Sequence, residues 1–249
     1  MLTPEQRDRL EVVLVSPRNP LNIGAVARAM ANFSFSRLTV VAPYEAHWRE
    51  ARSAVGAPDL LRDAREAPTV AEAVAECTFV AGTGTRTHRQ PVQPVLLLSD
   101  AAPVVAARLS DEGRAALVFG PEKHGLTRDD LSYCHVLIEI PTDPRQPSMN
   151  LGQAVAVCLY ELARPFGPDG PQNHARTDSP SSTSENLERL AGLIEEAMIA
   201  AGYSPRAMQP ANRHDLRVLL RRLAPSALDT RRMMGLFRRI VRRLQHPSR

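Results

Sequence analysis

Three polar segments contain the side chains that could bind a ligand or assist a reaction, and each adjoins a stretch with the pattern of a strand. The first, residues 19–28 (NPLNIGAVAR), contains Asn22, Gly24 and Arg28. Asn22 can cap a helix that begins near Gly24, which leaves backbone N–H groups at the helix start free to bind an anion. With Arg28 in the second turn, the segment fits a clamp for phosphate or ribose. Its alternative interpretation is a capped helix with a solvated arginine.

The second segment, residues 117–127 (LVFGPEKHGLT), places Gly120 at the end of a strand and Gly125 before a helix. Glycine at the carboxyl end of a strand lets a ligand approach the backbone closely. Glu122 could bind a hydroxyl group or pair with an arginine, and His124 is either a general base or a solvated loop histidine. The segment lacks the glycine spacing of dinucleotide-binding and ATP-binding loops, so neither ligand is supported.

The third segment, residues 140–150 (IPTDPRQPSMN), is an excursion stiffened by three prolines between a strand and a helix. Ser148 and Asn150 stand at the helix entrance, as ligand-binding side chains or only as N-caps. Across the three segments there is no Ser-His-Asp order, metal-ligand cluster or carboxylate pair. Nucleophilic, metal-dependent and glycosidic chemistry therefore have no support, and we expect no metal.

The elements that position these segments alternate between strand and helix patterns. Short apolar runs predict strands at residues 11–15, 37–42, 78–81, 115–119 and 136–140. Helical patterns occupy residues 24–33, 68–77 and 150–164, and Thr127 with Asp130 marks another helix start. This alternation predicts an α/β fold with a parallel sheet covered by helices.

A change of composition divides the chain. Residues 165–184 are rich in proline, glycine, serine and threonine, which is typical of a linker. Ser182 and Glu185 form a capping-box pattern before the next helix, and further helices are expected at 212–223 and 227–244. The last is amphipathic, with an apolar face formed by Met233, Leu236, Phe237, Ile240, Val241 and Leu244. The expected domains are 1–164, the linker 165–184, and a small helical domain, 185–249.

Charge is distributed unevenly over the 249 residues, whose formal net charge is +4. Residues 206–249 contain twelve arginines against Asp215 and Asp229, a net +10, whereas residues 1–205 carry −6. Such asymmetry suggests a basic module for a polyanion. Lys123 is the sole lysine, a bias that genomic base composition could explain.

The chain has the features of a cytoplasmic protein. It contains no run of 18 apolar residues, and its polar N-terminus lacks the order of a secretory signal. Cys77, Cys134 and Cys158 are widely spaced, so we interpret them as buried thiols in a reducing compartment.

Taken together and in this order, the three segments resemble the motifs of the SpoU (TrmH-like) branch of the SPOUT RNA 2′-O-methyltransferases. The N-x-G-x-x-x-R motif is matched by Asn22, Gly24 and Arg28, and F-G-x-E-x-x-G-L by residues 119–126. The third motif is matched by Ile140, Pro141, Ser148, Asn150, Leu151, Ala154, Tyr160 and Glu161. Met149 replaces a common leucine of similar volume. The resemblance covers residues 10–164.

The resemblance implies a sheet with a C-terminal trefoil knot that binds S-adenosyl-L-methionine. It places cofactor contacts at Thr83, Gly84, Thr85, Gly120, Ile140, Pro147, Ser148 and Met149. It also implies a homodimer whose active site is completed across the interface. The catalytic set would be Arg28, Asn22, Glu122, Ser148 and Asn150. Arginine is normally always protonated, so orienting the ribose hydroxyl and stabilising developing negative charge is the easier role for Arg28.

Within that branch, the linker and helical extension are most similar to the TrmJ type. This implies a tRNA substrate methylated on the ribose of cytidine or uridine at anticodon-loop position 32, with the basic extension contacting phosphates. The extension could instead be a solvated helical hairpin that enlarges the dimer. Three alternatives stay open: an rRNA 2′-O-methyltransferase, an RNA-binding protein without activity, and a small-molecule α/β enzyme.

Overall fold

A computed structural model describes residues 1–84, 91–110, 113–164 and 180–245. Within them, seven strands form one parallel sheet in the order β3-β2-β1-β6-β4-β7-β5, which confirms the predicted α/β class. The strands are β1 (Leu10–Val15), β2 (Arg37–Val41), β3 (Arg65–Ala67), β4 (Phe79–Thr83), β5 (Val95–Leu97), β6 (Ala115–Phe119) and β7 (Val136–Glu139). The trefoil knot stays a prediction.

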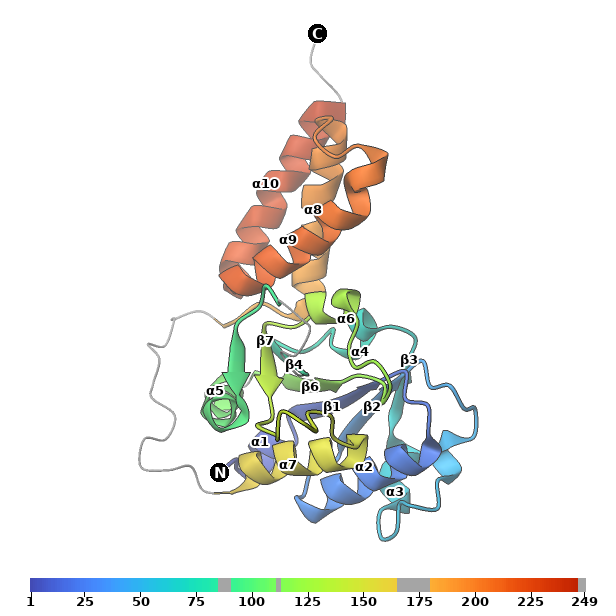
Figure 1. Ribbon diagram of the computed structural model, residues 1–249. Coiled ribbons are helices and arrows are strands. Elements are labelled where there is room, and N and C mark those ends of the chain that lie inside the picture. Colours follow the sequence, from blue (N-terminus) through green and yellow to red (C-terminus); the bar gives the residue numbers. More distant parts are fainter. Residues whose placement is uncertain (85–90, 111–112, 165–179, 246–249) are drawn as a thin grey trace.

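Helices cover both faces of the sheet, because alternate strand residues point to opposite sides. In β1, Val12 and Leu14 join the core beneath α2, α5 and α7, whereas Val13 and Val15 join the core beneath α4 and α6 (Figure 1). The helices before the linker are α1 (Pro4–Arg7), α2 (Pro20–Asn32), α3 (Pro58–Asp63), α4 (Val70–Ala73), α5 (Leu98–Ser110), α6 (Arg128–Ser132) and α7 (Leu151–Ala163), with a 3₁₀ turn, η1 (Trp48–Glu50).

The C-terminal unit consists of α8 (Ser184–Ala200), η2 (Arg206–Met208), α9 (Gln209–Leu223) and α10 (Ala227–Gln245). It projects from the α4–α6 side of the sheet (Figure 1). Its apolar cluster joins Leu190, Ala191, Leu220 and Met234. The face predicted for α10 was partly wrong, because Leu236 and Leu244 are exposed whereas Met234 is buried. The domain boundaries stay predictions, and residues 165–179 of the expected linker lie outside the described residues.

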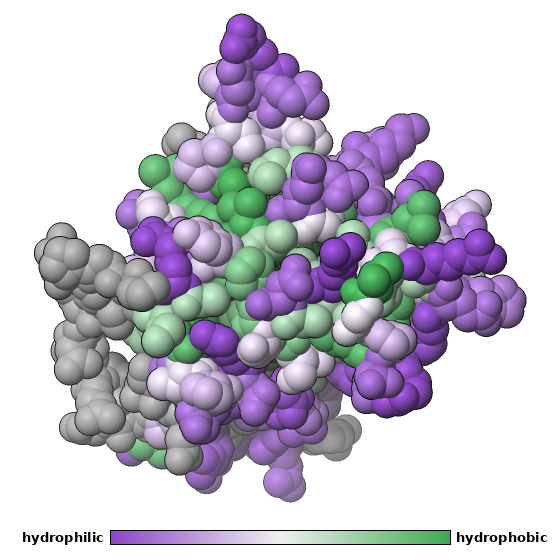
Figure 2. Space-filling view, turned by 90° about the horizontal axis from the view of Figure 1, so that it is seen from below, coloured by the Kyte–Doolittle hydropathy of each residue, from purple (hydrophilic) through white to green (hydrophobic). Residues whose placement is uncertain are grey.

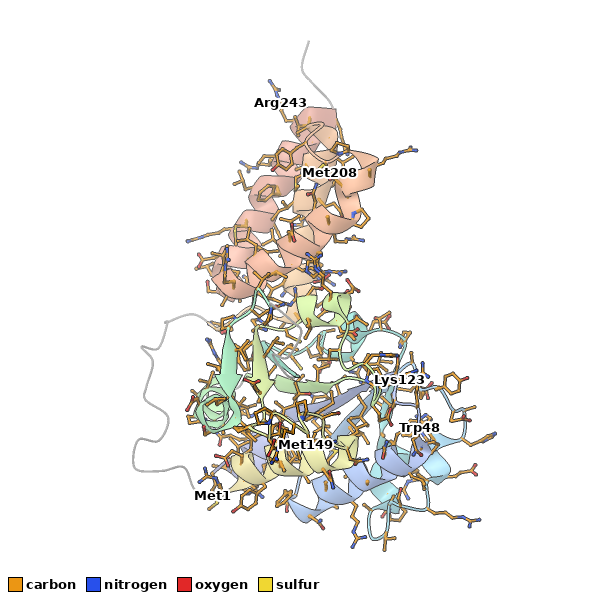
Figure 3. The ribbon with its side chains drawn as sticks, viewed as in Figure 1. Met1, Trp48, Lys123, Met149, Met208 and Arg243 are labelled. Carbon is orange, nitrogen blue, oxygen red and sulfur yellow. The ribbon has the colours of Figure 1, made fainter. Side chains whose placement is uncertain are left out.

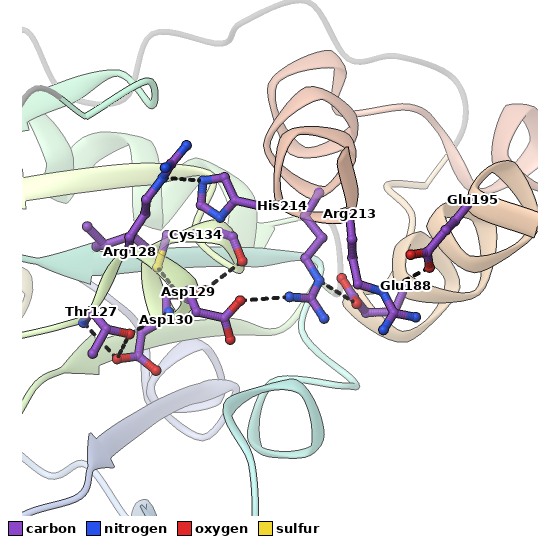
Figure 4. Close-up of polar contacts among 12 residues, drawn as sticks. Thr127, Arg128, Asp129, Asp130, Cys134, Glu188, Glu195, Arg213 and His214 are labelled. Carbon is purple, nitrogen blue, oxygen red and sulfur yellow. Dashed lines mark hydrogen bonds and ion pairs between the residues drawn. The ribbon is translucent and has the colours of Figure 1, made fainter. Parts of the chain in front are cut away.

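Ion pairs join this unit to the part of the chain that carries the sheet (Figure 4). Arg217 bridges Asp129 of α6 and Glu188 of α8, at 3.0 Å from each. Arg221, only 2% exposed, donates to the Tyr133 carbonyl at 2.8 Å and to Glu188 at 3.1 Å. The two halves therefore share a buried polar junction.

Two helix starts differ from the sequence predictions. The N-cap of α2 is Asn19, whose side chain accepts from the Leu21 N–H at 2.9 Å, and Pro20 takes the first helical position. The prediction that Asn22 caps a helix near Gly24 was therefore wrong. The N-cap of α8 is Thr183, so the capping box predicted at Ser182 and Glu185 was also wrong.

Other local predictions agree with the structure. Thr127 and Asp130 form a capping box at α6, and Asn150 caps α7. The three cysteines are buried and free, as expected. The helix predicted at 68–77 contracts to α4, whose N-cap is Thr69. Among the described residues, no helix is both long and apolar enough to cross a bilayer.

Candidate active site

A cavity of about 440 Å³ lies at the carboxyl ends of β4, β6 and β7. These strand ends are adjacent in the sheet, which brings the second and third polar segments to one place. Lys123 and Met149 line it from different loops (Figure 3). Seven of the eight predicted cofactor contacts also line it: Thr83, Gly84, Gly120, Ile140, Pro147, Ser148 and Met149. The eighth, Thr85, lies outside the described residues.

The wall formed by residues 120–125 is a tight loop that requires glycine. The Gly125 N–H donates to the Pro121 carbonyl at 2.8 Å, and Gly125 has a φ of +63°. A Cβ atom on Gly120 would lie 2.2 Å from the backbone nitrogen of Leu126. Such a contact would force the backbone to move, so Gly120 keeps the loop folded against the cavity.

A hydrogen-bond network links all three polar segments beside this cavity. Asn22 donates through Nδ2 to Glu122 Oε1 at 2.6 Å, and Asn150 donates through Nδ2 to Asn22 Oδ1 at 2.9 Å. Asn150 Oδ1 in turn accepts from the Gly152 N–H at 2.9 Å and caps α7. The three amide and carboxylate side chains therefore hold α2, the 120–125 loop and α7 in one arrangement.

Glu122 is held as a carboxylate within this network. Burial alone would raise the pKa of its carboxyl group, but the hydrogen bond from Asn22 and those from backbone N–H groups outweigh burial, and the pKa is lowered. The backbone donors include Arg18 at 3.2 Å and Asn19 at 3.3 Å. Glu122 thus acts as a structural acceptor for the start of α2.

Close packing of α2 against α7 completes this arrangement. A Cβ atom on Gly152 would lie 2.8 Å from Ala25 Cβ, so glycine lets the two helices approach. Phe33 and Tyr160 meet at the far end of the pair, with ring centroids 6.1 Å apart. The first and third segments are neighbours for this reason.

Arg28 does not join the cavity of its own chain. It is exposed, and it has no hydrogen bond or ion pair among the described residues. It lies six residues beyond Asn22, about 9 Å along the helix axis and on another side of the helix. Of the five predicted catalytic residues, the structure places Glu122, Asn22 and Asn150 in one network and Ser148 in the cavity lining, with Arg28 apart.

Several lining residues were missed from the sequence. Lys123, Thr142 and Ala154 were not proposed as site residues, although each lies within or beside a polar segment. Thr142 donates to the Pro147 carbonyl at 3.3 Å and closes the proline-rich loop. In the sequence, the position of Lys123 next to Glu122 was the one signal that could have indicated a site residue. In the described part of the chain, no group of three or more His, Cys, Asp or Glu side chains could hold a metal ion.

The fold and the cavity define a parallel α/β protein with a cavity at the carboxyl ends of its strands and with a basic helical extension. Residues 9–160 match the model of the SpoU rRNA Methylase family. The chain belongs to this family.

Its relatives include proteins of the TrmJ type. The chain is 33% identical to the tRNA (cytidine/uridine/adenosine-2′-O-)-methyltransferase TrmJ of Pseudomonas aeruginosa, over 97% of this chain and 96% of that protein. It is 31% identical to the tRNA (cytidine/uridine-2′-O-)-methyltransferase TrmJ of Yersinia pestis, over 96% and 94%. The crystal structure of TrmJ from Z. mobilis superposes with a TM-score of 0.80 at 32% identity, covering 92% of this chain and 98% of that one.

Proposed function

We propose that this protein transfers a methyl group from S-adenosylmethionine to a ribose 2′-hydroxyl of tRNA. The observation that carries the proposal is the network of Asn22, Glu122 and Asn150, which joins the three family motifs beside one cavity. The TrmJ relatives match over nearly the whole chain, including the C-terminal helices, and their names state tRNA 2′-O-methylation. Cytidine or uridine at anticodon-loop position 32 is the proposed target.

The cavity suits S-adenosylmethionine in size and chemistry. Its volume lies within the range of about 300–1,000 Å³ common for small-ligand pockets. Apolar groups of Ile140, Met149 and Leu151 provide surfaces for an adenine ring, and Gly84 and Gly120 lie in the same lining. A Cβ atom on Gly84 would meet nothing within 4 Å, so its absence lets a ligand lie close to the backbone there. Thr83, Pro147 and Ser148 complete the proposed cofactor set.

The bound cofactor supplies an electrophilic methyl group. In the net transfer, the 2′-hydroxyl would exchange its proton for this methyl group, and S-adenosylhomocysteine would be the leaving group. Asn22, Glu122 and Asn150 keep the loops at the distances that the transfer needs. Ser148 lies in the cavity lining, where its hydroxyl can contact the ribose. Arg28 is the proposed cation that orients the hydroxyl and stabilises its developing negative charge.

A homodimer would bring Arg28 to the reaction, because Arg28 is remote from the cavity of its own chain. The α2–α7 face has the character of such an interface: Leu21 is 56% exposed and Tyr160 is 55% exposed. Figure 2 looks onto this side and shows hydrophobic residues across its centre with polar residues around them. Burial of such a patch is favourable. We propose that Arg28 of one copy serves the cavity of the other.

The C-terminal arginines fall into two groups. Arg213, Arg217, Arg221 and Arg232 form ion pairs with carboxylates of the chain itself. By contrast, Arg231, Arg238, Arg239 and Arg242 are exposed, and none has an ion pair among the described residues. The second group lies on α10, and we propose that it contacts tRNA phosphates.

Free buried thiols agree with a cytoplasmic location, which is also a proposal.

Ribosomal RNA is the second candidate substrate, favoured by the family description. Transfer of labelled methyl from S-adenosylmethionine to purified tRNA and to ribosomal RNA separates the two. We expect label in tRNA alone; label in ribosomal RNA alone contradicts the proposal. A calorimetric titration of S-adenosylmethionine tests the cavity separately, and absence of heat at high protein concentration would exclude the cofactor and favour the inactive RNA-binding alternative.

A further inference from the structure

We infer that Lys123 binds the phosphodiester that adjoins the reacting ribose. The inference rests on the proposed function, since it assumes that tRNA enters the cavity with its 2′-oxygen. It assigns a phosphate-binding subsite to the rim of the cavity and makes Lys123 a residue that selects and positions RNA.

The location of Lys123 is the first observation. It lines the cavity between Glu122 and His124 on the loop that Gly120 keeps folded. Its side chain is also exposed, so it stands where the cavity opens to solvent. Among the described residues, it is the only lysine or arginine in the cavity lining.

The charge of Lys123 has no counter-ion within the described structure. Glu122 is the adjacent carboxylate, but its oxygens accept from Asn22 and from the backbone N–H groups of Arg18 and Asn19. Lys123 has no ion pair among the described residues. The arginines at the domain junction differ, because Arg217 and Arg221 are matched with Glu188. An unmatched ammonium at a cavity rim favours an anion brought by the reactants.

The chemistry of the substrate decides which anion this is. In RNA, the 3′-phosphate is attached to the carbon next to the one that carries the 2′-oxygen. A ribose whose 2′-oxygen reaches into the cavity therefore brings a phosphodiester to the rim. The amino-acid carboxylate of the cofactor is the competing anion, and it differs in arriving without RNA.

The amino-acid composition also distinguishes Lys123. The other 30 of the 31 basic residues are arginine, and the single lysine is at this rim. A lysine ammonium is a compact point charge on a flexible stem, whereas an arginine is a planar fork that suits fixed bidentate contacts. A flexible point charge can follow a phosphate as the nucleotide enters.

Steady-state kinetics with Lys123→Gln test the inference. We expect kcat/KM for tRNA to fall about tenfold or more, the value for loss of one charge-assisted contact. The dissociation constant for S-adenosylmethionine should stay unchanged. The salt slope of tRNA binding should decrease by about 0.7–0.9, one phosphate contact. Lys123→Arg should keep the slope, because it keeps the charge.

Arg62→Gln is the matched control. It also removes one positive charge, but from an exposed side chain of α3 that pairs with Asp59 and Asp63. Its slope and kcat/KM should equal those of the unmodified protein. If Lys123→Gln behaves like this control, the inference is wrong. If it weakens cofactor binding and leaves tRNA binding intact, Lys123 binds the cofactor carboxylate instead. Failure of the unmodified protein to methylate tRNA would contradict the proposed function itself.

Selective acylation gives an independent readout that needs no variant. Lys123 is the only lysine, so a water-soluble N-hydroxysuccinimide acetate can modify one side-chain amine, and peptide mass spectrometry can measure it. We expect tRNA to protect Lys123, while S-adenosylmethionine alone does not. Equal acylation with and without tRNA, or full protection by the cofactor alone, would overturn the inference.

Discussion

Asn22 donates a 2.6 Å hydrogen bond to Glu122 across 100 residues of sequence, and the same side chain accepts from Asn150. One amide group therefore connects three segments that are distant along the chain. Glu122 also accepts hydrogen bonds from two backbone N–H groups at the start of α2. The beginning of that helix and the cavity loop are therefore connected directly.

A double-mutant cycle between Asn22→Ala and Glu122→Gln measures this connection. Hydrogen bonds to charged groups contribute about 1.5–3 kcal/mol, so each single change should lower the free energy of unfolding. The double variant should lose less than the sum, with a coupling energy of at least about 1 kcal/mol. Urea denaturation supplies the four values, and strict additivity would show that the contact is energetically unimportant.

Gly120→Ala should abolish cofactor binding and destabilise the protein. The added Cβ would meet the Leu126 backbone nitrogen at 2.2 Å, so the cavity loop must move. Gly192→Ala in α8 is the matched control, because its Cβ meets nothing within 4 Å. That change should leave cofactor binding intact and stabilise α8 by about 0.5–1 kcal/mol. Calorimetric titration compares the two, and normal binding by Gly120→Ala would contradict the prediction.

Strand positions were predictable because buried parallel strands are continuous apolar runs, as at residues 115–119. The elements β5 and α5 were not predicted, because their join at Leu97 and Leu98 carries no cap or turn signal. It also started α2 four residues late, since the Asn19-Pro20 cap precedes the apolar periodicity. Packing, rather than a local signal, fixes the boundary between β5 and α5, whereas the start of α2 follows from its cap.

His135 should make stability depend on pH. Burial lowers its pKa from 6.5 to about 3, helped by the charges of Arg221 and Arg108. The folded protein keeps the ring neutral, whereas the unfolded chain binds a proton below pH 6.5. The contribution of neutral His135 to the free energy of unfolding is therefore complete above pH 6.5. It is lost as pH falls toward 3, by about 1.4 kcal/mol per pH unit.

His135→Asn tests this dependence and keeps an acceptor for the Val80 N–H, which His135 Nδ1 binds at 3.1 Å. Between pH 6.5 and 4, the slope of unfolding free energy against pH should be smaller in the variant by about 1.4 kcal/mol per unit. Urea titrations at several pH values measure both slopes. Equal slopes would mean that His135 titrates alike in both states.

Substitution of Arg221 should affect mainly the free energy of unfolding, whereas substitution of Arg238 should affect mainly tRNA binding. Arg221→Ala removes hydrogen bonds to Glu188 and to the Tyr133 carbonyl, while Glu188 keeps Arg217 as its partner, so the change should cost about 1–3 kcal/mol. Arg238→Ala removes an exposed charge, so it should change stability by less than about 0.5 kcal/mol but weaken tRNA binding and lower its salt slope. Denaturation and filter binding measure both properties. A stable Arg221→Ala protein, or an unchanged slope for Arg238→Ala, would contradict this division.

The motif residues of the candidate site could be predicted from the sequence, but the contacts that those residues make could not. Gly120, Ser148 and Met149 were named from motif positions and line one cavity. The 2.6 Å contact of Asn22 with Glu122 could not be read from spacing, because it depends on the pairing of β1 with β6, which brings the segments after the two strands together. That Arg28 does not line the cavity could not be predicted either. Helical periodicity indicates which side of a helix a residue occupies, but it does not indicate what that side contacts.

Arg28→Ala should keep cofactor binding and lose methyl transfer. Arg28 is exposed and does not line the cavity, so its removal should not alter the calorimetric affinity for S-adenosylmethionine. If Arg28 serves a second copy, mixing Arg28→Ala with Gly120→Ala protein should restore some activity, since one site of the mixed dimer keeps both residues. Full activity of Arg28→Ala alone would refute its role.

Mapping of the methylated nucleotide is the direct test of the proposed tRNA 2′-O-methylation. Purified protein, S-adenosylmethionine with a deuterated methyl group and unmodified tRNA are incubated, and the tRNA is digested to oligonucleotides that are sequenced by mass spectrometry. We expect a deuterated methyl group on the ribose 2′-oxygen of cytidine or uridine at anticodon-loop position 32. A methyl group on a base, or no transfer by protein that binds the cofactor, would contradict it.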